Sequence, residues 1–353
     1  MINNYTQHLI NKDDTVTAAL IKLNELASDA ILFLVDDDLK LYGSLTDGDL
    51  RRGLIEGKTL QARLQAFTQE NPKKILYDNY LIDEIIKYRN NGFKILPIVN
   101  NNDVIIDVIN FNKLISYLPL TAFIVAGGKG HRLRPLTLNT PKPMLKVGEK
   151  PILEHNIDSL IKYGIKNINI SIKYLGHQIE EYFGNGSAKG INISYTNEDL
   201  PLGTIGSITN CESFINDEDI LLINSDLLTT INYEKMYLFF KDNEADLVVG
   251  GVPYKVNVPY GVLESDNNNN IVSLTEKPTY TYFSNAGIYI FKKKFIDLIP
   301  SNTHYNATDL IDKLLSLNLK VMKYEMTEYW LDIGKKDDFD KAQIDIKNLE
   351  YFK

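Results

Sequence analysis

The chain has 353 residues, which is enough for two domains of ordinary size. Hydrophobic residues make up 44% of it, charged residues make up 24%, and the mean hydropathy is −0.18, which excludes a disordered or fibrous protein. The formal net charge of −8 argues against general nucleic-acid binding, because a phosphate backbone needs a broad basic surface.

Three features of the sequence bear on its compartment and on metals. No window approaches the ~18 consecutive apolar residues that a membrane span needs. The start, MINNYTQHLINKDDTV, is polar and contains an early acidic pair, unlike a signal peptide. Cys211 is the only cysteine, which excludes an intramolecular disulfide and a cysteine-cluster metal site. We therefore expect a cytoplasmic protein, with no membrane or nucleic-acid partner.

The first ~118 residues contain an internal repeat. The apolar runs ILFLV at residues 31–35 and ILPIV at residues 95–99 each follow an amphipathic stretch and precede a polar turn. Aligning the final valines of the two runs lets both units continue without a gap to Leu50 and Leu114. Each unit predicts a helix, a strand, a turn, a second strand and the start of another helix. The alternative is two unrelated helix–strand units.

This repeat resembles a tandem pair of CBS domains over roughly residues 10–118. In that family a Gly-x-x-Thr/Ser-x-x-Asp string ends the second strand, and its Thr and Asp hold the phosphate and ribose of an adenine or guanine nucleotide. Gly43, Thr46 and Asp49 fit the string in the first repeat, whereas the second repeat departs from it. The resemblance implies a CBS ligand site at Thr46 and Asp49. The alternative is that these two residues only cap the following helix.

We expect a domain boundary near Pro119, with a tandem CBS regulatory module over residues 1–118 and a second domain over residues 119–353. The second domain begins with a short apolar strand at residues 123–126, which runs into a loop with the sequence Gly-Gly-Lys-Gly. Glycines let backbone N–H groups approach a phosphate without a Cβ in the way.

The charge pattern around this loop also indicates an anion site. Between Ala126 and Gly148 there is no Asp or Glu, although the chain as a whole is acidic. The same stretch carries five basic side chains, Lys129, Arg132, Arg134, Lys142 and Lys146. The loop is neither a Walker A motif nor a dinucleotide-binding motif, because Leu133 stands where the latter needs its third glycine.

The segment resembles the sugar-1-phosphate nucleotidyltransferase signature, Gly-Gly-x-Gly-x-Arg-Leu-x-Pro-Leu-Thr followed by Pro-Lys-Pro. The matching residues are Gly127, Gly128, Gly130, Arg132, Leu133, Pro135, Leu136, Thr137, Pro141, Lys142 and Pro143. His131 replaces the commoner Thr or Ser. Further strings of the family follow in order, and the resemblance spans roughly residues 121–345. These strings are Pro201-Leu202-Gly203-Thr204, Asn224-Ser225-Asp226, Tyr260-Gly261-Val262-Leu263, Glu276-Lys277-Pro278, Asn285-Ala286-Gly287 and YWLDIG with Asp332.

The resemblance implies an α/β fold, in which a Rossmann-like α/β/α sandwich with a mixed, mostly parallel sheet binds nucleotide beyond the carboxyl ends of its strands. It assigns catalysis to Arg132, Lys142 and Asp226, and Mg²⁺ binding to Asp226 and Asp332. The implied nucleotide-binding residues are Ala126, Gly127, Gly128, Gly130, His131, Glu198, Pro201, Leu202, Gly203 and Thr204. The implied sugar-phosphate-binding residues are Gly261, Glu276, Lys277 and Asn285.

The implied reaction joins a nucleoside triphosphate and a sugar 1-phosphate, giving a nucleotide sugar and pyrophosphate. The attacking phosphate oxygen is already anionic, so the reaction needs positioning and charge neutralisation rather than a general base. Glu198, five positions before Gly203, stands where family members face the base edge. Because an ionised carboxylate only accepts hydrogen bonds, it suits the N1–H and N2–H₂ donors of guanine and favours GTP. The alternative is that Glu198 is a solvated loop residue.

As a whole the chain resembles nucleotidyltransferases fused to a CBS pair, a group that includes glucosamine-1-phosphate guanylyltransferases of bacterial legionaminic acid biosynthesis. We therefore favour glucosamine 1-phosphate, with mannose, heptose and N-acetylglucosamine 1-phosphates left open. The alternatives are a UDP- or dTDP-sugar pyrophosphorylase, a mannose- or heptose-1-phosphate guanylyltransferase, and a non-catalytic CBS nucleotide sensor. A homo-oligomer is expected, because CBS pairs often associate face to face.

Overall fold

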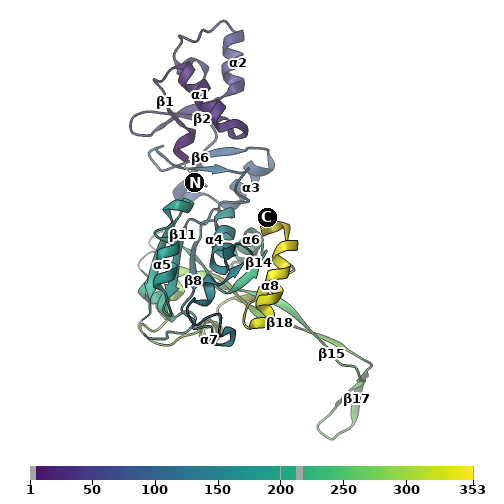
Figure 1. Cartoon of the computed structure of the whole chain (residues 1–353). Helices are drawn as coiled ribbons and strands as arrows, with labels where there is room; N and C mark the ends of the chain where they lie inside the picture. Colours follow the sequence, from purple (N-terminus) through teal and green to yellow (C-terminus); the bar gives the residue numbers. More distant parts are fainter. Residues whose placement is uncertain (1–4, 199, 212–217, 353) are drawn as a thin grey trace. The chain divides into compact units, whose positions relative to one another are not determined.

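The computed structural model describes residues 5–198, 200–211 and 218–352, and the chain divides into two compact units (Figure 1). The N-terminal unit comprises the residues up to Pro119 together with Leu160–Lys166 and Gly186–Ile191. The C-terminal unit comprises Leu120–Ser159, Asn167–Asn185 and the residues from Asn192 onward. Within the described ranges, no helix combines the length and the apolar character that crossing a membrane requires.

The N-terminal unit is built on two small sheets, with strand orders β1-β2-β3-β4 and β5-β6-β7. Their strands are β1 (Leu9–Asn11), β2 (Ile31–Val35), β3 (Leu41–Thr46), β4 (Gln69–Glu70), β5 (Ile75–Leu76), β6 (Ile95–Val99) and β7 (Ile105–Asn110). The accompanying helices are α1 (Val16–Leu26), α2 (Asp47–Ile55) and α3 (Ile82–Asn90). Apolar side chains of both β2 and β6 are buried, as continuous apolar runs predict.

The predicted internal repeat is present in the structure. β2 begins at Ile31 and β6 at Ile95, and β3 begins at Leu41 and β7 at Ile105, so both strands recur after 64 residues. A register irregularity near the end of β2 recurs near the end of β6 with the same spacing. The two β-hairpins also meet, because the backbone N–H of Leu41 donates to the Asp103 carbonyl, and that of Ile105 donates to Leu39.

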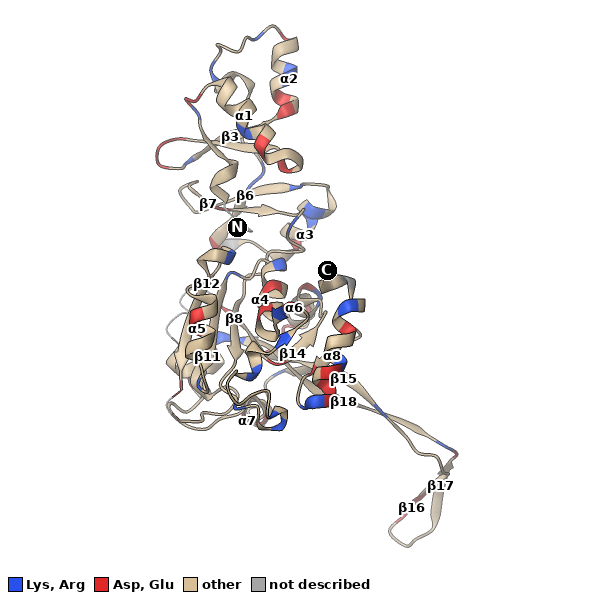
Figure 2. Ribbon diagram, in the orientation of Figure 1, with Lys and Arg blue, Asp and Glu red and all other residues tan. Residues whose placement is uncertain are grey.

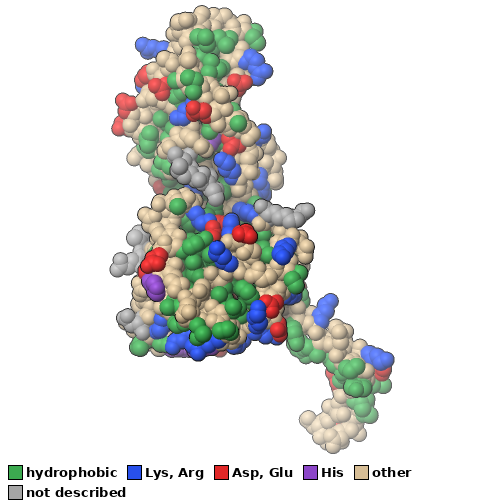
Figure 3. Space-filling model, viewed as in Figure 1, with side chains coloured by type: hydrophobic (Ala, Val, Ile, Leu, Met, Phe, Trp, Pro, Cys, Tyr) green, Lys and Arg blue, Asp and Glu red, His purple; other side chains and the backbone are tan. Residues whose placement is uncertain are grey.

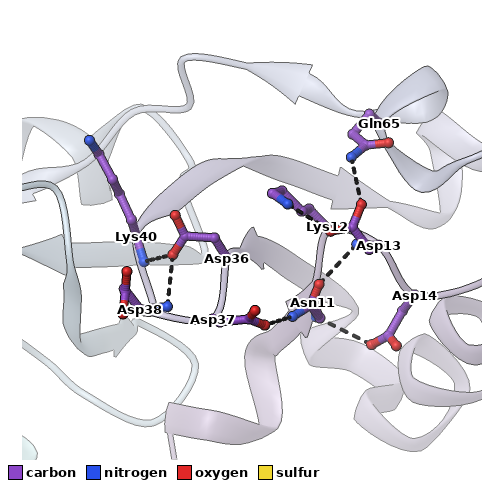
Figure 4. Close-up of polar contacts among 9 residues, drawn as sticks. All are labelled: Asn11, Lys12, Asp13, Asp14, Asp36, Asp37, Asp38, Lys40 and Gln65. Atoms are coloured by element: carbon purple, nitrogen blue, oxygen red, sulfur yellow. Dashed lines mark hydrogen bonds and ion pairs between the residues drawn. The ribbon is translucent and has the colours of Figure 1, made fainter.

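The turn after each first strand is held in the same way, as Figure 4 shows for the first repeat. Asp36 Oδ1 accepts the backbone N–H groups two and four residues later, at 3.0 and 2.9 Å. Asn100 Oδ1 accepts the corresponding groups in the second repeat, at 2.9 and 3.1 Å. Asp and Asn favour such turns because their short side chains bond to the nearby backbone.

The two repeats differ at their ends. The first continues from β3 into α2, whereas residues 111–113 after β7 form a turn, so the prediction of a second helix start there is wrong. In this turn the N–H groups of Lys113 and Leu114 both donate to the Asn110 carbonyl, and the chain then leaves toward β8 (Thr121–Val125).

The C-terminal unit is organised around a mixed sheet with the order β12-β11-β8-β13-β18-β15-β19. Only β18 runs antiparallel to its neighbours, which confirms the predicted mixed, mostly parallel sheet. Besides β8, its strands are β11 (Asn167–Ile172), β12 (Asn192–Asn197), β13 (Asp219–Asn224), β15 (Leu247–Asn257), β18 (Thr279–Lys292) and β19 (Val321–Glu325). The described helices are α4 (Ile152–Lys162), α5 (His177–Phe183), α6 (Tyr233–Asp242), α7 (Ala307–Ser316) and α8 (Lys336–Asn348).

The central strands are buried on both faces. Phe123 of β8 lies opposite Leu222 of β13, and both pack in one cluster with Leu310 of α7. Ile124 and Leu221, which alternate to the other face, are also fully buried. Double burial explains why these strands read as continuous apolar runs rather than as alternating ones.

Short strand pairs lie outside this sheet. They are β9 (Lys146–Val147) with β10 (Lys150–Pro151), β14 (Leu227–Thr229) with β20 (Trp330–Asp332), and β16 (Val262–Ser265) with β17 (Ile271–Thr275). β15 and β18 extend together beyond the sheet, and the β16–β17 hairpin lies at their far end (Figure 1). We call residues 252–284 the arm. Charged side chains are spread over both units, and the arm carries few of them (Figure 2).

Candidate active site

The glycine loop leaves the carboxyl end of β8 and closes over Lys142. Gly130 has a left-handed φ of +59°, and a Cβ there would lie 3.0 Å from Thr137 Cγ2 and 3.1 Å from Lys142 Cβ. The Thr137 hydroxyl donates to the Gly130 carbonyl at 2.8 Å, which fixes the end of the loop. Only glycine combines this conformation with this close approach, so the loop backbone lies directly beside the lysine stem.

Lys142 lies between two carboxylates. Its side chain is 11% exposed, and its ammonium group donates to Asp226 Oδ2 and lies 3.8 Å from Asp332 Oδ1. Pro141 and Pro143 flank Lys142 in a short 3₁₀ turn, where proline limits the backbone freedom of the segment. The lysine is therefore presented from a stiff loop rather than from a helix or strand.

The two aspartates come from segments that pair with each other. Asp226 follows β13, and Asp332 ends β20, which pairs antiparallel with β14. Leu227 is the register partner of Asp332, and the N–H of Ile333 donates to the Asp226 carbonyl at 3.1 Å. This pairing brings together two carboxylates that are separated by more than 100 positions in the sequence.

Arg132 joins the same cluster from the glycine loop. A Cβ on Gly334 would lie 3.5 Å from Arg132 Nη2, so the guanidinium rests against the backbone two residues after Asp332. The site thus holds two basic and two acidic side chains. An arginine fork suits phosphate oxygens, and an ammonium group supplies a compact positive charge.

The geometry also includes a residue that the sequence did not single out. Asn156, 3% exposed on α4, donates its side-chain N–H to the Ile152 carbonyl at 3.1 Å and to the Leu227 carbonyl at 3.0 Å. It therefore holds the backbone directly after Asp226. The sequence gives no signal for this role, because Asn156 lies among other polar residues of α4, such as Glu154, His155 and Asp158.

The acidic pair fits a hard divalent cation. Asp226 Oδ1 is buried and has no hydrogen-bond partner within the described part of the chain. A buried, unsatisfied carboxylate oxygen is costly unless a ligand completes it. Among the residues described, no group of three or more His, Cys, Asp or Glu is placed so that it could hold a metal ion, so a metal here would have two carboxylate ligands from the protein. Mg²⁺ commonly binds through one or two carboxylates together with substrate phosphates.

Burial and the crowding of charged side chains in the site change the pKa of Asp332. Desolvation, and after it the neighbouring Asp226 carboxylate, raise the pKa of Asp332, and Lys142 and Arg132 only partly oppose the shift. The ionised form of Asp332 is therefore disfavoured in the free protein, and a bound cation would favour it.

The nucleotide-binding residues predicted from the sequence lie around the glycine loop. A Cβ on Gly127 would lie 3.5 Å from both carboxylate oxygens of Glu198. Glu198 accepts a hydrogen bond from the Ser171 hydroxyl and one from the N–H of Leu202, the latter at 3.3 Å. Glu198 thus faces the loop rather than open solvent. Its contact with Ser171 on β11 was not predicted.

The Pro201–Thr204 loop rests on a second segment that the sequence analysis missed. Gly203 has a φ of +78°, and a Cβ there would lie 2.5 Å from the Tyr305 carbonyl oxygen. The Tyr305 N–H donates to the Leu202 carbonyl at 2.9 Å, and the Ala307 N–H donates to the Thr204 hydroxyl at 2.8 Å. The start of α7 therefore positions this loop.

The predicted sugar-phosphate residues separate into two groups. Asn285 lies at the root of the arm and accepts the Gly287 N–H at 3.0 Å. A Cβ on Gly287 would lie 2.4 Å from Asn224 Nδ2, two residues before Asp226, so this string borders the acidic pair. Trp330 Nε1 donates to the Ala286 carbonyl at 2.9 Å and ties the string to β20.

Gly261, Glu276 and Lys277 lie instead on the arm. Glu276 is next to Gly261, where a Cβ would lie 2.9 Å from Glu276 Oε2. All three residues are exposed. The structure does not bring them to the Lys142 cluster of the same chain.

The predicted CBS ligand residues form a helix cap. Thr46 and Asp49 make a capping box at the start of α2, and the Asp49 carboxylate also accepts from Arg52 and Gln69. Asp49 is buried, and its oxygens have protein donors, as expected for the capping alternative.

Comparison with known proteins supports the resemblance for the C-terminal unit. The family described as Nucleotidyl transferase matches residues 121–348. The chain belongs to this family. It is 32% identical over 231 residues to a mannose-1-phosphate guanylyltransferase of Mycobacterium tuberculosis, covering 64% of each chain. It is also 32% identical over 258 residues to a UTP–glucose-1-phosphate uridylyltransferase of a Synechocystis species, covering 65% of this chain and 66% of the relative.

The chain thus spans just under two thirds of the length of these two curated relatives. Among solved structures, HddC from Yersinia pseudotuberculosis, complexed with GMP-PN, is 28% identical, with a TM-score of 0.50. The alignment covers 64% of this chain and 99% of HddC. These matches confirm the prediction of a sugar-1-phosphate nucleotidyltransferase family and of its α/β fold.

Replacing Gly203 by alanine should displace the Pro201–Thr204 loop, because the new Cβ would meet the Tyr305 carbonyl. Gly184→Ala is the matched control, since Gly184 also has a positive φ, +54°, but a Cβ there meets nothing within 4 Å. We expect both variants to lose about 1 kcal/mol from backbone strain, and Gly203→Ala to lose at least that much again. Thermal denaturation compares the two variants, and equal melting temperatures would contradict the close contact between Gly203 and the Tyr305 carbonyl.

Replacing Asp332 by asparagine should stabilise the free protein at neutral pH. Because folding raises the pKa of Asp332, ionisation costs stability above the raised pKa, and this cost disappears as the pH falls below the ordinary value. The melting temperature of Asp332→Asn should therefore exceed that of the wild type at pH 7.5, and the gain should shrink toward pH 4. Asp337→Asn, at a side chain that is 85% exposed, is the control and should show no gain. A gain that grows on acidification would refute the electrostatic account.

Proposed function

We propose that the chain transfers a nucleotidyl group from a nucleoside triphosphate to a sugar 1-phosphate, releasing pyrophosphate. GTP is the favoured nucleotide and glucosamine 1-phosphate the favoured acceptor, and the product serves surface-glycan or nonulosonic (legionaminic) acid synthesis. The observation that carries this proposal is the placement of Lys142 between Asp226 and Asp332, beside a glycine loop and Arg132. Two cations and two carboxylates around an open glycine loop suit two phosphate groups that must approach each other.

In the proposed reaction an oxygen of the sugar phosphate attacks the α-phosphorus of the nucleotide. A new P–O bond forms, the bond between the α-phosphorus and its bridging oxygen breaks, and pyrophosphate leaves with the electron pair. Lys142 holds the attacking phosphate against the α-phosphate, and Arg132 neutralises the leaving pyrophosphate. Gly127 and Gly128 offer backbone N–H groups to the triphosphate, and a Cβ on Gly128 would meet nothing within 4 Å, so the space in front of it is open.

Asp226 and Asp332 would hold Mg²⁺ in this proposal, with the unpaired Asp226 Oδ1 as one ligand atom. A bound Mg²⁺ screens the phosphate charges and orients them. Lys142 then exchanges its carboxylate partner for a phosphate oxygen. Because its side chain is nearly buried and flanked by prolines, this exchange requires little rearrangement of the backbone.

The preference for GTP rests on Glu198. Its carboxylate lies beside Gly127 and already accepts two protein donors, which fixes its orientation. The remaining lone pairs can accept two N–H groups from one base edge, and guanine offers them at N1 and N2. A guanylyltransferase and a uridylyltransferase stand among the relatives, so the alternative of UTP or dTTP is a direct competitor in the assay.

The N-terminal unit enters the proposal as a tandem CBS module over residues 1–118 that regulates the enzyme. Its two repeats, with their equivalent turns and register irregularities, support this assignment. For Thr46 and Asp49 to bind a nucleotide, the ligand would have to replace hydrogen bonds of the α2 cap. We propose a homo-oligomer in the cytoplasm, where nucleotides and sugar phosphates are available.

Lys142→Ala should reduce turnover by about 10²-fold or more, since it removes a charge that acts on the transferring phosphates. Lys146→Ala is the matched control, because it removes an exposed lysine from the same basic stretch and should leave turnover nearly unchanged. Pyrophosphate release with GTP and glucosamine 1-phosphate measures both. Near-wild-type turnover in Lys142→Ala would rule out its assigned role.

Glu198→Gln should weaken the preference for GTP over UTP, because glutamine presents one acceptor and one donor in place of two acceptors. The loss of a charged hydrogen bond to guanine predicts a decrease of about tenfold or more in the ratio of kcat/KM values. Glu181→Gln, at an exposed position on α5, is the control. If the wild type prefers UTP or dTTP, the base assignment fails while the mechanism stands.

A further inference from the structure

The arm exposes more apolar surface than a monomer has reason to show, as Figure 3 illustrates on one face. Seven of its large apolar side chains are between 56% and 76% exposed, namely Tyr254, Tyr260, Leu263, Ile271, Val272, Leu274 and Tyr282. Scattered apolar residues are normal on protein surfaces, whereas a contiguous apolar patch marks an interaction site.

Four of these side chains form two cross-strand pairs. Tyr254 of β15 lies opposite Tyr282 of β18, and Leu263 of β16 lies opposite Leu274 of β17. Directly opposed residues point to the same face of a ribbon, so each pair forms one apolar surface element. Because a two-stranded ribbon is at best marginally stable in water, such pairs are expected to pack against another surface.

The chemistry of the arm limits what that surface can be. Its charged side chains are Lys255, Glu264, Asp266, Glu276 and Lys277, which nearly cancel. Neither a nucleic acid nor an anionic membrane would select so neutral a surface. An apolar, weakly charged arm instead fits another folded protein surface.

Two polar residues of the arm bear on which protein the arm contacts. Glu276 and Lys277 are exposed, and within the described ranges neither has a hydrogen-bond or ion-pair partner. A carboxylate and an ammonium group side by side suit a sugar hydroxyl and a phosphate, which are the features of a sugar 1-phosphate. The Lys142 cluster that would use them is in the body of the C-terminal unit, whereas β16 and β17 lie at the far end of the arm (Figure 1).

We infer that the arm packs on the C-terminal unit of a second copy of this chain and places Glu276 and Lys277 at that copy's Lys142–Asp226–Asp332 site. This inference rests on the proposed function for the role of the two side chains. A two-fold axis lets each arm complete the site of the other copy, and the interface closes without leaving a free arm.

The exposed apolar surface of the arm is large enough for a stable interface between two copies. An aromatic side chain buries about 150–250 Å². Three tyrosines and four aliphatic residues, each more than half exposed, thus offer on the order of the ~800 Å² per partner of a standard interface. The reciprocal arm doubles this area, which is sufficient for a stable dimer.

Mixing two inactive variants tests the inference. Asp226→Asn keeps the arm but disables the site, and Glu276→Ala keeps the site but disables the arm. Each alone should fall below about one hundredth of wild-type turnover. Co-expressed with different tags, they should recover about a quarter of it, because half the dimers are mixed and each mixed dimer holds one complete site. No recovery in purified mixed dimers, or full activity of Glu276→Ala alone, would overturn it.

A second measurement does not depend on activity. Copies labelled with ¹⁴N and ¹⁵N are mixed during refolding or co-expression, and a carbodiimide cross-links Lys277 to nearby carboxylates. Cross-links between the arm and the body of the C-terminal unit should join peptides of different label, and links only within one label would contradict exchange between copies. If the wild type shows no nucleotidyl transfer, the proposed function fails, and this experiment still tests whether the arm packs on a second copy.

The oligomeric state provides the matched control. Sedimentation should show a dimer for the wild type and for Ile344→Ser, which removes an exposed apolar residue from α8. The double variant Leu263→Ser and Leu274→Ser should dissociate at least tenfold more readily, because it removes one complete apolar pair. A monomeric wild type, or equal dissociation of the two variants, would refute the interface.

Discussion

The geometry of the site depends on the ion pair between Lys142 and Asp226. A nearly buried ammonium group is stable only when a carboxylate compensates it, and removal of either partner leaves an uncompensated charge. Asp226 Oδ1 nevertheless remains without a partner, and Asp332 is held close by with a raised pKa. One buried carboxylate oxygen thus stays unsatisfied beside a carboxylate whose ionised form is disfavoured, and this is the arrangement that the proposed Mg²⁺ and phosphates would complete.

Several surrounding elements fix the positions of Lys142, Asp226 and Asp332. Gly130 brings the loop backbone against the Lys142 stem, prolines stiffen the segment that carries the lysine, and the β14–β20 pair fixes both aspartates. Asn156 fastens the backbone after Asp226 from α4. In the proposed reaction this preorganisation would lower the barrier, because the charges need no reorientation.

Short stretches of the sequence predicted the parts of the fold that depend on interactions between neighbouring residues. The apolar run at residues 123–126 predicted a strand, and β8 lies there with mostly buried side chains, because such a run is contained in a few consecutive residues. The acid-free stretch around Gly127 predicted an anion site, which stays a prediction. The repeat was also visible, since Asp36 and Asn100 form equivalent turns by bonding to their own neighbours. The helix expected after β7 is absent, because residues 111–113 form a turn in which the N–H groups of Lys113 and Leu114 donate to the Asn110 carbonyl.

Contacts that join distant segments could not be predicted in this way. The support of Gly203 by Tyr305, and of the Asp226 backbone by Asn156, depends on the packing of α7 and α4 against loops far away in the sequence. The family resemblance grouped Glu276 and Lys277 with the other sugar-phosphate residues, but a resemblance does not say which copy of the chain supplies them. Their exposure on the arm is a property of the three-dimensional structure alone.

The most direct test of the account is pyrophosphate release by the intact chain, with GTP, UTP, dTTP, CTP and ATP each offered with a panel of sugar 1-phosphates, in Mg²⁺ and again in EDTA. The account predicts release that requires Mg²⁺ and is fastest with GTP and glucosamine 1-phosphate. No release with any pair, even after adenine and guanine nucleotides are added for the N-terminal unit, would contradict it and favour a non-catalytic nucleotide sensor.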